Sequence, residues 1–226
     1  MPYTTDTVRF FNELALNNNR SWFQDNKPRY VSHVKAPADV LAASLANRLE
    51  METHKTWIPK VFRIYRDVRF AKDKTPYKTR QGVSLSIAGR SADAPIGLFA
   101  AIDGHHITIG GGAFIWEKQE LKAYRAWLMM DNNAAELQKA VDALVSKDFI
   151  VSDAALKRLP REFDPDFAYP DLACRKGLRL WRELPATPNY LGDAYIDTVY
   201  ADFKKMMKFI HILQTIKAPF ALPDGF

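Results

Sequence analysis

The sequence predicts an α+β fold in which a central antiparallel sheet is packed by N-terminal and C-terminal helices. Apolar residues recur every three or four positions near both ends of the chain, which is the period of an amphipathic helix. In the middle, apolar and polar residues alternate, and Asp103-Gly104 separates two apolar runs as a hairpin turn would. No helical segment fits between these runs, so we expect antiparallel neighbours in a sheet of about four to six strands.

The N-terminal helices are expected in two groups. The first helix would bury Phe11 and Leu14 and begin at Thr5 or Asp6, which are good N-cap residues. A run of asparagines at residues 17–19 ends this pattern, and the prolines beyond it limit the next stretch to short helical pieces or first-turn positions. A stronger helix follows, whose buried stripe consists of Val34, Ala38, Leu41, Leu45 and Leu49.

The predicted strands cover residues 58–65, 82–87, 96–102 and 106–109. Three glycines, Gly110, Gly111 and Gly112, follow the last of these strands. Such a run lets the backbone approach a ligand closely or form an anion-binding turn. It also marks bulges and tight exits from a sheet. The structural interpretation is favoured, because glycine runs have little specificity for ligands.

The C-terminal half is expected to return to helix. A helix should start near Glu117, and Asn133 with Glu136 should cap a second one. A proline-rich loop is expected over residues 159–170, a strand over 177–184 and a last helix over 192–217. We see neither an internal repeat nor a low-complexity linker, so a single domain spanning residues 1–226 is expected.

Composition indicates a cytoplasmic globular protein. The chain has 226 residues, 47% of them hydrophobic and 26% charged, which is enough to bury a sizeable core. Its one cysteine, Cys174, cannot form an internal disulfide, and this suits a reducing compartment. No apolar run approaches the roughly 18–20 residues of a membrane span, and no signal peptide is visible.

Standard catalytic and nucleotide-binding motifs are absent from the sequence. It contains no phosphate loop, no dinucleotide fingerprint, no H-E-x-x-H pair and no G-x-S-x-G elbow. His105 and His106 are adjacent in the expected hairpin, where successive side chains point to opposite faces, so we predict exposed turn histidines. No metal site is predicted, the sequence identifies no cofactor, and oligomeric state stays open.

The formal charge of +6 is concentrated in one short window. Residues 60–80 hold eight basic side chains and only two acids, Asp67 and Asp73, so the rest of the chain sums to zero. Such a focus raises the local concentration of anions. The basic residues of the window are Lys60, Arg63, Arg66, Arg69, Lys72, Lys74, Lys78 and Arg80.

The chemistry of this cluster suits an anion. Guanidinium groups present fixed forks to carboxylates and phosphates, and arginines this close repel one another unless an anion lies between them. If the segment is extended, Arg63 and Arg69 share one face, whereas Arg66 falls on an apolar face and needs a partner or a break in the strand. Asp67 is the nearest acid in sequence, and Tyr77 offers an uncharged donor.

At these residues the chain resembles a family of uncharacterised proteins known as domain of unknown function 2461. The motif R-x-x-R-D-x-R-F, followed by an acid, Lys and Tyr, carries the resemblance, together with flanking stretches over almost the whole chain. The matching residues of the motif are Arg63, Arg66, Asp67, Arg69, Phe70, Asp73, Lys74 and Tyr77. The resemblance implies one domain and no particular activity. It also implies that Asn19, Trp22, Lys27 and Tyr30 belong with the arginine cluster.

The arginine cluster is therefore compatible with three functions. The leading one is binding, or turnover, of an anionic small molecule bearing phosphate or carboxylate, with enzymatic activity left open. Its anion would be held by Arg63, Arg66, Arg69 and Lys74, with a hydrogen bond from Tyr77, while Asp67 orients the arginines or acts as a base. The second is nucleic-acid binding, since aromatic residues lie near the cluster. The third is a structural or partner-binding role, with the arginines as a salt-bridge hub.

Overall fold

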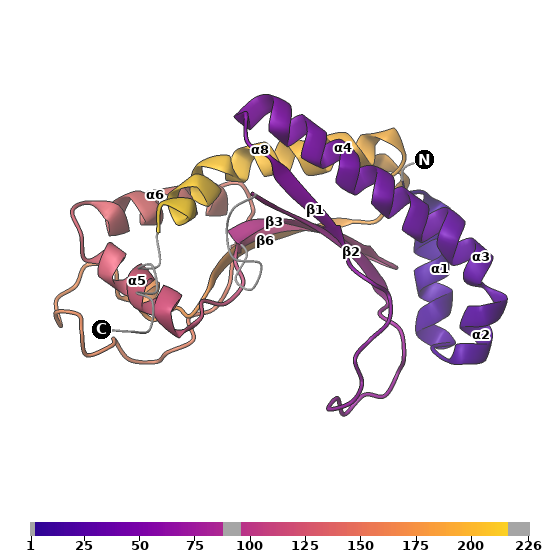
Figure 1. The fold of residues 1–226 in the computed structure, drawn as a ribbon, viewed down its shortest axis with the longest axis horizontal. Helices are drawn as coiled ribbons and strands as arrows, with labels where there is room; N and C mark the ends of the chain where they lie inside the picture. Colours follow the sequence, from indigo (N-terminus) through magenta and orange to yellow (C-terminus); the bar gives the residue numbers. More distant parts are fainter. Residues whose placement is uncertain (1–2, 88–95, 217–226) are drawn as a thin grey trace, which may run out of the picture. The chain divides into compact units, whose positions relative to one another are not determined.

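A computed structural model describes residues 3–87 and 96–216 (Figure 1). Its six-stranded antiparallel sheet has the order β1-β2-β3-β4-β6-β5, and helices accompany it, so the predicted α+β fold is confirmed. The strands are β1 (Trp57–Val61), β2 (Arg80–Ile87), β3 (Ile96–Asp103), β4 (His106–Ala113), β5 (Ile150–Val151) and β6 (Leu178–Pro185).

The chain divides into two compact units, which are described separately. Of the described residues, unit 1 comprises 3–87, 98–110 and 182–204, and unit 2 comprises 96–97, 111–181 and 205–216. The prediction of a single domain stays a prediction. In the part of the chain that the structure describes, no helix combines the length and the apolar character needed to cross a bilayer.

Unit 1 begins with a helix, α1 (Thr5–Leu16), that buries Phe10, Phe11 and Leu14. Its N-cap is Thr4, one residue before the predicted start, because the Thr4 side chain accepts from the Asp6 N–H. The following helical segments are α2 (Arg20–Asp25), α3 (Lys27–Tyr30), a π-helical turn η1 (Val31–Lys35) and α4 (Ala36–Thr53).

The prolines of this stretch lie in the first turns of α3 and α4, and the helical segments before α4 are short, as predicted. Pro37 has no N–H, so the carbonyl of His33, four residues earlier, loses its usual helical donor. The Thr7 hydroxyl supplies a donor instead, at 2.6 Å from the His33 oxygen. A hydrogen bond from α1 therefore stabilises the irregular turn.

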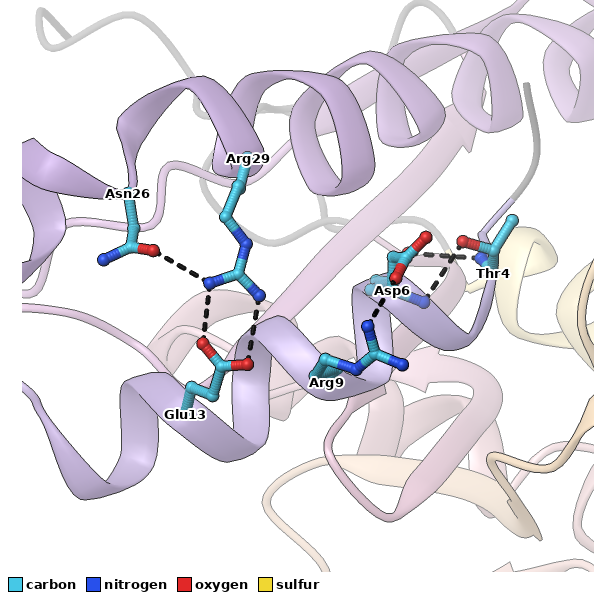
Figure 2. A network of polar contacts seen from close by, with 7 residues as sticks. Thr4, Asp6, Arg9, Glu13, Asn26 and Arg29 are labelled. Atoms are coloured by element: carbon cyan, nitrogen blue, oxygen red, sulfur yellow. Dashed lines mark hydrogen bonds and ion pairs between the residues drawn. The ribbon is translucent and has the colours of Figure 1, made fainter.

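A second contact, between α3 and α1, also joins this helical stretch to the first helix, as Figure 2 shows. The Arg29 guanidinium of α3 donates to both carboxylate oxygens of Glu13 in α1, at 2.6 and 3.1 Å, and to the Asn26 side-chain oxygen at 2.8 Å. These hydrogen bonds lower the pKa of Glu13 and raise that of Arg29.

The core of unit 1 lies between α4 and the first strands of the sheet. α4 packs against β1 and β2 (Figure 1), and its predicted stripe, Leu41, Leu45 and Leu49, is buried. The facing strand residues are buried too, among them Trp57 of β1 and Leu85 of β2. The first part of α8 (Asp193–Thr215) also belongs to this unit, after the short 3-10 turn η2 (Pro188–Tyr190).

The predicted hairpin is confirmed: β3 and β4 are joined by a turn in which Asp103 accepts hydrogen bonds from the backbone of His105 and His106. Both histidines are exposed, as expected. The predicted strand over residues 58–65 is too long, because β1 ends at Val61. Residues 62–79 leave the sheet between β1 and β2 as a long excursion, which we call the arm (Figure 1).

Unit 2 contains α5 (Lys118–Leu128), α6 (Asn133–Val145), α7 (Pro170–Ala173) and the later part of α8. The N-cap of α6 is Asn132 rather than Asn133. The glycine run lies within β4 rather than after the last strand. Gly112 has φ +125°, and a Cβ there would lie 2.1 Å from the Leu178 carbonyl oxygen, so close packing of the backbone explains this glycine. Cys174 is buried and free.

Candidate functional site: the basic arm

The arm is an ordered extension of the β1–β2 hairpin rather than a loose loop. Its two sides exchange backbone hydrogen bonds, from Lys78 N to Ile64 O at 2.8 Å and from Arg66 N to Pro76 O at 2.9 Å. Tyr65 and Tyr77 form an antiparallel bridge between them. We call residues 67–75, beyond the last of these bonds, the tip of the arm.

Arg66 finds its partners across the arm. Its guanidinium donates to the carboxylate of Asp73 and to the hydroxyl of Thr75. Asp73 also accepts from the Thr75 backbone N–H at 2.9 Å, and these bonds, with Arg66 first, lower its pKa to about 2. The partner of Arg66 is thus Asp73 and not Asp67, the nearest acid in sequence.

The other predicted ligands at the tip are also engaged with the arm itself. The Asp67 carboxylate accepts from Arg69 at 3.0 Å (Nε) and 2.7 Å (Nη2), and this pairing lowers the pKa of Asp67. Lys74 Nζ donates to the Val68 carbonyl at 3.0 Å. A carboxylate with a lowered pKa is a weaker base, so this geometry favours an orienting role for Asp67 over a catalytic one.

The base of the arm is fixed to the first helices of unit 1. The Asn18 side chain bonds both backbone groups of Tyr77: Nδ2 donates to the carbonyl at 2.9 Å, and Oδ1 accepts from the N–H at 3.1 Å. The Tyr77 ring stacks on Phe23 of α2 with centroids 4.0 Å apart and is only 3% exposed. Burial raises the pKa of Tyr77. Tyr77 is therefore an anchor of the arm as well as a candidate donor.

A hollow of about 370 Å³ opens beside this anchor, entirely within unit 1. We call it the base hollow. Its charged lining comprises three basic side chains and one acid, so the balance is positive. The lining residues are Ala15, Asn18, Arg66, Asp73, Thr75, Tyr77, Lys78, Thr79 and Arg80. In residues 3–87 and 96–216, no group of three or more His, Cys, Asp or Glu side chains is arranged to hold a metal ion.

Three cations at the base of the arm lack the pairing seen at its tip. Among the described residues, no carboxylate lies within ion-pair distance of Arg63, Lys78 or Arg80. Burial, and then the positive charges of Arg63 and Arg80, lower the pKa of Lys78. Lys78 Nζ lies 5.8 Å from the Phe62 ring centroid, a favourable contact for a cation.

The structure separates the predicted site residues into groups. Arg66 and Tyr77 line the base hollow, and Arg63 lies close enough to Lys78 to lower its pKa. Arg69 and Lys74 instead form hydrogen bonds with other groups of the tip. The remaining predicted residues lie in or beside the early helices. Asn19 caps α2 by accepting from Trp22 N at 3.0 Å, Trp22 packs 5.7 Å from the Phe10 ring, and Lys27 lies in α3.

Sequence reasoning missed several members of the base hollow: Asn18, Thr75, Thr79, Lys78 and Arg80. The last two were counted in the charge window but not assigned to a site. Asn18 belongs to the asparagine run that predicted only a helix end. Its role depends on a contact with a residue 59 positions away, for which no local pattern exists.

These features define the class of the protein: an α+β protein whose antiparallel sheet carries the basic arm between its first two strands. The chain belongs to DUF2461, a family described as conserved hypothetical proteins, whose profile matches residues 6–211. The resemblance inferred from the arginine motif is thereby confirmed. No curated protein matches the chain in sequence.

Proposed function

We propose that unit 1 binds an anionic small molecule, bearing phosphate or carboxylate, in the base hollow of the arm. One observation carries the proposal: Lys78 and Arg80 line an open hollow without a carboxylate partner among the described residues, and Arg63 is close enough to Lys78 to lower its pKa. Like charges held together in this way repel one another, and a bound anion removes that repulsion. Charge-assisted hydrogen bonds from lysine and arginine are the usual means of holding such groups.

The lining also restricts the ligand. Lys78 and Arg80 offer charged donors, and the exposed Thr79 offers a hydroxyl. Asp73 is the one carboxylate of the lining, so it repels a second anionic group and favours a ligand with a hydroxyl or amino donor. A phosphorylated or carboxylated metabolite of this kind fits a reducing, cytoplasmic setting, which also suits the unpaired, buried thiol of Cys174.

Binding of inorganic phosphate, citrate and a panel of phosphorylated metabolites tests the proposal by calorimetry at constant ionic strength. The substitutions Lys78→Gln and Arg80→Gln each remove one charged donor, and Lys55→Gln, an exposed lysine away from the arm, is the matched control. A hydrogen bond to a charged group contributes about 1.5–3 kcal/mol, so each hollow variant should lose about 10- to 150-fold in affinity. Equal affinity in all three variants, or no binding by the wild type, contradicts the proposal.

An architectural role is the second candidate, and it applies to Arg66 and Arg69. Both guanidiniums are matched by acids of the arm itself, Asp73 and Asp67. Under this proposal Arg66→Gln loosens the tip and lowers thermal stability, and it weakens phosphate binding in the base hollow less than Lys78→Gln or Arg80→Gln does. Loss of phosphate binding in Arg66→Gln, with an unchanged melting temperature, would instead make Arg66 a direct ligand.

A further inference from the structure

The tip of the arm exposes a large apolar ring. Phe70 is 97% exposed, the highest value among the large hydrophobic side chains that the structure describes. Its segment is ordered by the Asp67–Arg69 pair and by the Lys74 bond to Val68 O. An exposed apolar side chain alone is unremarkable on a protein surface. Phe70 differs from an isolated exposed residue because it lies at the tip of an ordered arm that also carries many cations.

Positive charge extends along the whole arm. Residues 62–79 contain six basic side chains and two acids, a difference of +4. Arg63 at the base and Lys72 at the tip are both exposed, and neither makes an ion pair within the described chain. Tyr65, between them, is 47% exposed and offers a second aromatic surface. Cations and aromatic rings are therefore interleaved along the arm.

We propose that the arm binds single-stranded nucleic acid, with Arg63 and Lys72 contacting phosphates and the Phe70 ring stacking on an unpaired base. Basic grooves or arms with interleaved aromatic rings suit single strands, because every base presents a flat face to an aromatic side chain. The arm contains no Asn or Gln, and its Arg66 and Arg69 forks are already paired. Reading of base edges is therefore not expected, and binding tolerates different sequences.

A lipid surface is the competing partner for an exposed phenylalanine beside cations. A membrane would engage only the tip. The arm extends away from the sheet (Figure 1), and the seven residue steps from Arg63 to Phe70 span up to about 23 Å at 3.3 Å per residue. Charges interact over roughly 8 Å at physiological salt, so Arg63 at the base would contribute little to membrane contact. A polyanion lying along the arm engages both ends, and the distribution of charge favours it.

This inference does not rest on the base hollow. Phe70, Lys72 and Tyr65 lie outside its lining, and a phosphate titration does not involve the tip. Failure of phosphate binding thus contradicts the proposed function alone, and failure at the tip contradicts this inference alone.

Fluorescence anisotropy with labelled oligothymidylate and oligouridylate tests the inference on the full chain. Phe70→Ala should weaken binding by about 5- to 150-fold, since stacking on one base contributes about 1–3 kcal/mol. Leu16→Ala is the matched control, because Leu16 is also apolar and 86% exposed but lies in α1. Because Phe70 makes no buried contact, its variant should keep the wild-type melting temperature.

A salt series distinguishes the partners. Arg63→Gln and Lys72→Gln should each reduce the slope of log affinity against log salt by about 0.7, the value for one phosphate contact on a single strand. Lys55→Gln should leave it unchanged. A tighter complex with a duplex of the same sequence, equal affinity of Phe70→Ala and Leu16→Ala, or absence of oligonucleotide binding overturns the inference. So does binding only to phosphatidylserine vesicles with no effect of Arg63→Gln.

Discussion

Asn18 and Tyr77 are joined by two hydrogen bonds in which a side-chain amide takes the place of a neighbouring β-strand. The amide donates to the Tyr77 carbonyl and accepts from the Tyr77 N–H, at 2.9 and 3.1 Å. Both backbone groups at the base of the arm are thus satisfied by a residue from the turn between α1 and α2. The position of the arm relative to these helices depends on this pair.

Replacement of Asn18 by alanine should loosen the arm more than the rest of unit 1. Two backbone groups lose their partners, at a cost of about 1–3 kcal/mol in the free energy of unfolding. The Tyr77 amide should exchange with solvent faster than the loss of global stability accounts for. Asn19→Ala is the control: it removes the α2 cap, typically about 1 kcal/mol, without touching Tyr77. Equal protection of the Tyr77 amide in both variants contradicts the assigned role.

The element types of this chain were predictable because they follow local patterns. The Asp103-Gly104 pair between two apolar runs predicted the hairpin, and the stripe from Leu41 to Leu49 predicted α4. Pro28 and Pro37 predicted short helical pieces or first-turn positions, and both prolines lie in first turns, because proline lacks the N–H needed further along a helix. The hydrogen bond from Thr7 to the His33 carbonyl was not predictable, because the two residues are 26 positions apart.

The site was predictable only in part, because local sequence patterns do not reveal contacts between residues that are distant in sequence. Charge density identified the arm, since it is a property of consecutive residues. The partner of Arg66 was not identified, because Asp73 becomes its neighbour only when the arm reverses direction. Arg66 and Arg69 are paired with acids inside the arm, so Lys78 and Arg80 become the candidate ligands. The motif alone does not distinguish these two residues from the other basic residues of the window.

Thr7→Val should lower the free energy of unfolding by about 1–3 kcal/mol in urea denaturation, because the part-buried His33 carbonyl loses the donor that Thr7 supplies. Thr7→Ser keeps the hydroxyl and should retain most of the stability. In a Pro37→Ala background the helix regains the missing N–H, so Thr7→Val should cost less there. Additive effects of the two substitutions would show that Thr7 and Pro37 are not coupled through His33.

Asp73 should titrate near pH 2 in the folded protein and return toward 3.8 in Arg66→Gln, since the Arg66 hydrogen bond is the largest cause of its lowered pKa. A depressed carboxyl pKa stabilises the folded arm fully above about pH 3.8, and the contribution is lost as the pH falls through about 2. Carbon-detected NMR of the Asp73 carboxyl measures this midpoint. Asp67, which pairs with Arg69, should not respond to Arg66→Gln.

The pKa of Lys78 reports the positive charge around the base hollow. Burial lowers its pKa first, and the charges of Arg63 and Arg80 lower it further. The protonated lysine is thus less stable in the folded than in the unfolded chain, and stability attributable to it falls as the pH drops below its ordinary pKa of 10.5. Arg63→Gln and Arg80→Gln should each raise the pKa of Lys78, measured from its side-chain carbon shifts.

Inorganic phosphate should raise the same pKa in the wild type, because an anion in the hollow stabilises the charged amine. Chloride at equal ionic strength is the control for screening, and Lys55 serves as an internal reference, being exposed and distant from the arm. A rise at Lys78 with phosphate but not with chloride is the expected result. If the two salts move Lys78 and Lys55 alike, the crowded cations at Arg63, Lys78 and Arg80 do not form an anion site.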